Sequence, residues 1–230
     1  MPLTFPSHAA LPLPLKLWRP RWFDGVALVV GSAAPDLAYA LDGSGLPVFP
    51  LSHQWPGLVL FCVPVTLVGA ALARLAAPAV AAHLPSRPVA LALPDYGVLG
   101  MARPAFAVSA LSALLASASH LLWDRLTEPL PVLDLASSAG GLLAAVALAV
   151  HVGRARLLRA WHGEPPDRPV RPWLFWSVAA LVTAAGAAVA SRLPGAFLPH
   201  TTVARLLLAL AAGLLAAAAV IRLVQPRPRP

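Results

Sequence analysis

Five long apolar runs constrain this chain more than any other feature. They cover residues 57–77, 105–123, 135–152, 173–191 and 206–221, each close to the roughly 17–25 residues that cross a hydrocarbon layer. Backbone polar groups find no water there, so such runs must be helical. The composition agrees, with 59% hydrophobic and 11% charged residues, where soluble domains carry about a quarter charged residues. The sequence therefore predicts an all-α fold, a polytopic membrane helix bundle in a lipid bilayer.

A sixth apolar stretch, residues 23–41, leaves the number of spans open at five or six. It contains Asp36 directly after Pro35, and proline disfavours a continuous helix at its own position and restricts the residue before it. The stretch either crosses the bilayer or dips into it and returns, shielded by the other helices.

We expect a single membrane domain over residues 1–230. Residues 1–128 carry the polar motifs, residues 129–224 supply further transmembrane helices, and residues 225–230 form a basic, proline-rich tail. The first residues lack the basic segment and apolar stretch of a cleavable signal peptide, so none is expected. The single cysteine, Cys62, lies in an apolar run and is expected to be an inert small hydrophobe with no disulfide.

The net charge of +8 predicts a membrane topology and no nucleic-acid partner, because the basic residues lie between apolar runs and form no basic patch. The arginine-rich stretch 153–172 and the C-terminus are expected in the cytoplasm, with the loops around His53 and Asp124 outside. If residues 23–41 cross, 14 of the 17 basic residues share one side. If they do not, Lys16, Arg19 and Arg21 change sides and the split is 11 to 6. The expected location is the cell (cytoplasmic) membrane, in multi-pass form.

Ionisable residues at membrane depth are candidates for function, and they occur here in short motifs. The motifs are Ser7-His8, the segment GSAAPD ending at Asp36, Ser52-His53, and SHLLWDRLTEP with His120, Asp124 and Glu128. His120 and Asp124 lie four residues apart and so share a helix face. An imidazole and a carboxylate placed in this way can ligate one cation. Glu128 precedes Pro129, so the helix is expected to end before it, which leaves a loop ligand or a solvated carboxylate.

Each motif has a structural alternative. His120 and Asp124 alone also suit a hydrogen-bonded pair at a helix end, without a metal. Asp36 alone suits an N-cap of the following turn. His8 and His53 individually indicate little. The other histidines are expected at the surface or the membrane interface: His83, His151, His162 and His200.

The order of the motifs resembles a bacterial membrane-protein family known mainly as a domain of unknown function. The motifs are S-H near the start, G-S-x-x-P-D, S-H-x-x-P-G and S-H-L-x-W-D-x-x-T. Members of that family open M-P-F-T-x-S-H-P-A, and this chain, MPLTFPSHAA, departs at Leu3 and Ala9. The family is in turn similar to the YdjM-like membrane-bound metal-dependent hydrolases. The positions that match their motifs are His8, Asp36, His53, His120 and Asp124.

Four positions depart from the patterns of these families. The segment VFPLSHQW lacks the first histidine and the arginine that precede the position of His53 in the hydrolases. Position 38 is alanine in place of an acid, and position 128 is glutamate where close relatives often have histidine. The resemblance therefore implies fewer metal ions than the hydrolases hold, or none.

The resemblance implies a divalent cation near the outer face, held by these five residues. Imidazole and carboxylate ligands without thiolates suit Zn²⁺, or else Mn²⁺, better than Ca²⁺. The implied function is a membrane-bound metal-dependent hydrolase acting on an ester or phosphoester, with a lipid head group as the natural substrate. The alternative is a non-catalytic membrane protein, a small transporter or a structural partner, in which the His/Asp pairs serve packing.

Overall fold

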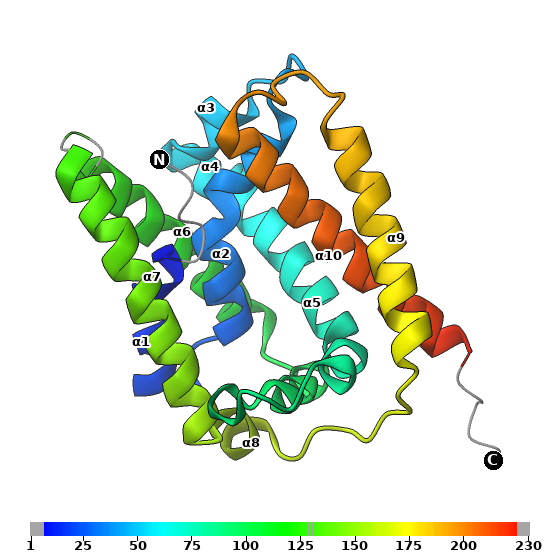
Figure 1. Ribbon diagram of the computed structural model, residues 1–230. Coiled ribbons are helices and arrows are strands. Elements are labelled where there is room, and N and C mark those ends of the chain that lie inside the picture. Colours follow the sequence, from blue (N-terminus) through cyan, green and yellow to red (C-terminus); the bar gives the residue numbers. More distant parts are fainter. Residues whose placement is uncertain (1–6, 128, 130, 225–230) are drawn as a thin grey trace. The chain divides into compact units, whose positions relative to one another are not determined.

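The computed structural model describes residues 7–127, 129 and 131–224. Every regular element in this part of the chain is helical, which confirms the all-α prediction. Five helices are long and apolar enough to cross a membrane (Figure 1), and each contains most of one predicted apolar run. They are the composite helix Trp55–His83, α6 (Phe106–Thr127), α7 (Pro131–Arg154), α9 (Pro172–Ala190) and α10 (Pro199–Leu223).

The composite helix begins irregularly. A short helix α3 (Val48–Ser52) leads into α4 (Trp55–Gly57), then a π-helical turn, η3 (Leu58–Cys62), and then α5 (Val63–His83). Gly57 allows α3 and α4 to meet closely, because a Cβ atom there would lie 1.8 Å from the carbonyl oxygen of Leu51. Such π-helical turns often occur beside functional sites.

The stretch over residues 23–41 is shorter than the five candidate spans. It forms α2 (Gly25–Leu37) and a 3₁₀ turn, η2 (Ala38–Leu41). The 13 residues of α2 extend about 20 Å and η2 adds roughly 8 Å, against a hydrocarbon layer of about 30 Å. Whether the stretch crosses the bilayer or dips into it and returns therefore stays a prediction. The preceding residues form η1 (Ser7–Ala10) and α1 (Leu13–Trp18).

These N-terminal elements form a hairpin along α6, in which α2 runs parallel to α6 (Figure 1). At the start of α2, the carboxylate of Asp24 accepts a hydrogen bond of 2.6 Å from the Ser109 hydroxyl, near the start of α6. At the end of α2, Asp36 lies 3.5 Å from His120, near the end of α6. His8 lies beside Asp124 at this same end. The chain thus runs from the far end of α6 to its start and back again.

Asp24 fixes the start of α2. Its side chain accepts hydrogen bonds from the backbone N–H groups of Val26 and Ala27, which is the role of an N-cap residue. Its own backbone N–H donates to the Ser112 hydroxyl at 2.9 Å. One residue therefore both begins α2 and attaches it to α6.

The tip of the hairpin is basic and aromatic. Arg21 and Trp22 line a groove with Ala107 and Leu111 of the first turns of α6. Trp18 and Trp22 are exposed over most of their surface. Because α6 begins at Phe106, the tip lies at the opposite end of α6 from His8 and Asp124.

The chain divides into two compact units. One consists of Met1–Ala71, Arg103–Ala149 and Leu193–Ala204, and the other of Leu72–Ala102, Val150–Arg192 and Arg205–Pro230. The expectation of one membrane domain stays a prediction. The first unit has a core of Ala34, Leu58, Cys62 and Leu121, in which Cys62 is buried and free of disulfides, as expected.

The second unit has its own core and its own buried carboxylate. Phe175, Ala179, Ala217 and Ile221 form the core. Asp95, in η5 (Leu93–Met101), accepts hydrogen bonds from Arg156 at 2.8 Å and Arg159 at 2.7 Å. Burial raises the pKa of Asp95, but these hydrogen bonds outweigh it and hold the pKa below its usual value.

His83 does not lie at the surface, one of the two places expected for it, and its position at the membrane interface stays a prediction. His83 is 7% exposed. Its Nδ1 lies 2.7 Å from the Ala79 carbonyl oxygen, and its Nε2 accepts the backbone N–H of Arg171 at 2.9 Å. The ring stacks on Phe175. His83 thus supplies a polar contact to the start of α9 from within the core, which its sequence neighbours do not reveal.

Candidate metal centre

The structure brings all five sequence-predicted residues together in the first unit. His8 lies in η1, Asp36 in the last turn of α2, His53 at the C-cap of α3, and His120 and Asp124 in the last two turns of α6. His8, Asp36 and His120 are buried, while His53 and Asp124 are partly exposed. The donor atoms form two triads, each within 4.8 Å, and both contain His120.

The tautomer of His120 follows from its contact with α2. Its Nδ1 lies 2.7 Å from the backbone carbonyl oxygen of Ser32, and a carbonyl can only accept, so Nδ1 carries the proton. A neutral ring then presents the lone pair of Nε2. This buried Nε2 makes no hydrogen bond within the described part of the chain. Backbone carbonyls commonly orient metal-binding imidazoles in this way.

His53 is oriented by the same kind of contact. The Ser52 hydroxyl donates to the Phe49 carbonyl oxygen at 2.9 Å, which leaves its oxygen to accept. The Nδ1 of His53 lies 2.9 Å from that oxygen, so Nδ1–H is the donor. The lone pair of His53 Nε2 is therefore the one directed toward Asp36.

One carboxylate oxygen lies between these two imidazoles. Asp36 Oδ1 is 3.5 Å from His53 Nε2 and 3.5 Å from His120 Nε2. Hydrogen bonds between nitrogen and oxygen are shorter, about 2.7–3.2 Å. A tetrahedral cation with bonds of about 2.0–2.2 Å separates its ligand atoms by roughly 3.3–3.6 Å. The spacing is that of ligands around one cation.

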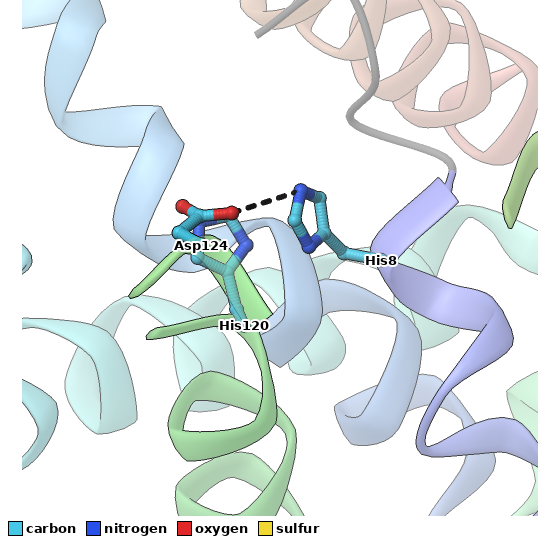
Figure 2. A group of neighbouring side chains, drawn as sticks. All are labelled: His8, His120 and Asp124. Carbon is cyan, nitrogen blue, oxygen red and sulfur yellow. Dashed lines mark ion pairs between the residues drawn. The ribbon is translucent and has the colours of Figure 1, made fainter. Parts of the chain in front are cut away.

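The second triad contains His8, His120 and Asp124 (Figure 2). Asp124 Oδ1 lies 3.6 Å from His8 Nε2, and Asp124 Oδ2 lies 3.0 Å from His120 Nε2. The rings of His8 and His120 are 4.0 Å apart. Burial lowers the pKa of His8 to about 4. The His8 imidazole is thus a neutral donor at pH 7.

His120 limits how the two triads can be used. Its Nε2 has a single lone pair, because Nδ1 is protonated, so His120 can bind only one cation. The Asp36 triad has the two spacings that suit a cation, and the Asp124 triad has one. A single ion bound to His120 Nε2 would therefore take its other ligands from both triads.

Of two alternatives that the sequence left open, the structure resolves one. The interpretation of Asp36 as an N-cap is wrong, because Asp36 belongs to the last turn of α2 and the following 3₁₀ turn has no side-chain cap. Glu128 lies outside the described residues.

Two contributors to the site carry no sequence signal of their own. The Ser32 carbonyl and the Ser52 hydroxyl orient the two imidazoles. His200, expected at the surface or the membrane interface, lies outside both triads and is partly buried 3.5 Å from Asp42. Its ring lies 4.5 Å from that of Tyr39, which in turn lies 5.9 Å from His53.

The fold and this cluster define a class, that of a multi-pass membrane helix protein with a buried His/Asp centre. A family model described as "Domain of unknown function (DUF4184)" matches residues 1–131. The chain belongs to this family, and the match contains all five residues of the cluster. No match was found among curated proteins or among solved structures.

Proposed function

We propose that this protein binds one divalent cation, Zn²⁺ or else Mn²⁺, through Asp36, His53 and His120, with Asp124 and His8 completing the site. The observation that carries the proposal is the position of Asp36 Oδ1, 3.5 Å from two imidazole nitrogens. Lone pairs and a carboxylate repel one another unless a cation or a proton lies between them.

The charges of the donors support the same conclusion. Two carboxylates, Asp36 and Asp124, balance one dication, and three neutral imidazoles add ligands without adding charge. A buried cluster of this kind without a cation would be expensive to desolvate. A set of nitrogen and oxygen donors without sulfur is the set that Zn²⁺ and Mn²⁺ accept.

We further propose that the site hydrolyses an ester or phosphoester at the outer membrane face, as the similarity to the YdjM-like hydrolases suggests. A dication held by Asp36, His53 and His120 would lower the pKa of a water at the site to near neutrality. Hydrolysis would add that water across the ester bond and give an acid and an alcohol. Water is thus the only co-reactant. The side chains hold the ion, and the Ser32 and Ser52 contacts keep the two imidazoles oriented.

Elemental analysis of the purified protein tests the metal site. We expect close to one zinc or manganese per chain in the wild type, and loss of most of it in His120→Ala and in Asp36→Asn. His200→Ala is the matched control, because His200 also pairs with an aspartate in the same unit but lies outside both triads. It should keep the wild-type metal content.

Hydrolysis is tested on the same samples with a chromogenic phosphate ester and a fluorescent phospholipid. Activity should disappear with a chelator and return with Zn²⁺ or Mn²⁺. Equal metal in the wild type and His120→Ala would reject the metal site and leave the packing alternative. Metal without metal-dependent hydrolysis would leave a metal-binding protein that is not this hydrolase.

A further inference from the structure

A cation–π pair connects two chain segments that contribute to the candidate metal centre. The guanidinium carbon of Arg125 lies 4.6 Å from the centre of the Trp55 ring. Arg125 directly follows Asp124, and Trp55 is two residues beyond His53. The pair therefore joins the two chain segments that supply the partly exposed ligands of the site.

The contact with Trp55 leaves the hydrogen-bond donors of Arg125 without an acceptor among the described residues. Cation–π stacking uses the face of the guanidinium, whereas its N–H groups point outward in the plane. No described residue accepts a hydrogen bond from the Arg125 side chain, and both Arg125 and Trp55 are exposed. A planar cation with free donors is the group that binds phosphate in bidentate fashion.

The net charge of the proposed centre leaves the attraction of an anion to another group, such as Arg125. Two carboxylates and one dication sum to zero, so the proposed centre itself has no net attraction for an anion. In this unit the other described lysine and arginine residues, Lys16, Arg19, Arg21 and Arg103, belong to the hairpin tip or precede the start of α6. Arg125 is the one described cation of the unit at the end where the donor atoms lie.

We propose that Arg125, oriented by Trp55, recognises the phosphoryl group of the substrate beside the metal centre. This inference rests on the proposed function and narrows it from esters in general to phosphoesters. The phosphoryl group belongs either to a lipid head group or to a soluble phosphoester, and both present the same anionic oxygens to the guanidinium.

The test uses full-length protein loaded with Co²⁺ in phosphatidylcholine nanodiscs. The visible absorbance of Co²⁺ reports metal binding, and its shift during titration with inorganic phosphate reports anion binding. We expect Arg125→Gln to weaken phosphate binding by about 10-fold or more with unchanged Co²⁺ content. Arg125→Lys should lose less phosphate affinity than Arg125→Gln, since lysine keeps the positive charge but cannot form a bidentate pair. The phosphate affinity of Trp55→Leu should lie between those of the wild type and Arg125→Gln.

The control is Arg192→Gln, which removes an exposed arginine predicted on the same side of the membrane, and it should bind phosphate like the wild type. A second set of nanodiscs contains phosphatidic acid. A spectral shift there without added phosphate assigns the phosphoryl group to a lipid, and a shift with phosphate alone assigns it to a soluble ester.

Failure of this inference and failure of the metal site give different results. Normal Co²⁺ binding with equal phosphate affinity in Arg125→Gln and Arg192→Gln would reject the role of Arg125, as would a wild type that binds Co²⁺ but not phosphate. Absence of Co²⁺ binding in the wild type would instead reject the proposed function itself.

Discussion

The Nδ1 nitrogen of His120 lies 2.7 Å from the backbone carbonyl oxygen of Ser32, although 88 residues separate the two in sequence. This contact makes the hairpin part of the candidate metal centre, because α2 both contributes Asp36 and fixes the tautomer of His120. Any change that moves α2 along α6 should therefore alter the centre, even at a distance from the ligands.

Gly31 offers such a change. A Cβ atom there would lie 3.0 Å from the Ala113 carbonyl oxygen and 3.1 Å from the Ala116 Cβ, both on α6. Because backbone cannot yield as a side chain can, Gly31→Ala should destabilise by about 1–3 kcal/mol and reduce metal content. Gly140→Ala is the control, since its Cβ would meet open space, and helix propensity should make it neutral or slightly stabilising. Thermal unfolding in detergent measures both, and equal midpoints would contradict close packing of α2 on α6.

Removing the Asp24 carboxylate should loosen the other end of the hairpin. Asp24→Ala loses the N-cap of α2 and the acceptor of Ser109, so we expect a loss of about 1–2 kcal/mol. Asp24→Asn keeps a capping oxygen and should lose less stability than Asp24→Ala. Denaturation curves of the two variants give the comparison, and identical curves would show that capping does not hold α2.

Asp95→Asn should destabilise the second unit in a pH-dependent way. The pKa of Asp95 is lowered in the folded state, so its stabilisation is complete above the unfolded pKa of about 3.9 and is lost as pH falls through the folded value. The thermal midpoint of the variant should be below that of the wild type at pH 5–7, and the gap should shrink below about pH 4. The control Asp167→Asn, at an exposed position, should have the thermal midpoint of the wild type. If the midpoint of Asp95→Asn were lowered equally at every pH, the charge of Asp95 would not be the cause.

Thiol labelling tests the topology. With Cys62 replaced by alanine, we expect an impermeant reagent to label Ser44→Cys in intact cells, but Arg19→Cys and Asp167→Cys only after permeabilisation. The expectation combines the arginine bias with the position of the hairpin tip beside the start of α6. In this topology Lys16, Arg19 and Arg21 lie with the cytoplasmic arginines, and α2 and η2 cross the membrane beside α6. Labelling of Arg19→Cys in intact cells, with Asp167→Cys protected, would place the tip outside.

The long helices could be predicted because the bilayer leaves an apolar run of about 20 residues one solution. His120 and Asp124 were predictable as a pair from helical periodicity alone. His8, Asp36 and His53 were grouped with them through the resemblance to a family, since nothing in their spacing joins residues so far apart. The structure places all five together, while their role as ligands stays a prediction.

Other features could not be predicted, because they depend on contacts between distant segments. The Asp24–Ser109 hydrogen bond and the Ser32 carbonyl leave no periodic pattern. Trp55 and Arg125 lie in different motifs, and nothing in the sequence predicts that they meet. His83 does not lie at the surface, and neighbouring residues do not indicate that it contacts the backbone of Arg171.

The parallel course of α2 and α6 also sets an order for biosynthesis. The ribosome adds roughly 5–20 residues per second, so His120 emerges about 4–18 s after Ser32, given the 88 residues between them. Throughout that delay Asp24 and Asp36 have no α6 to contact, and a hairpin carrying two carboxylates is poorly suited to enter lipid alone. The N-terminal segment is translated first. It must nevertheless take its final place only after α6 has been inserted.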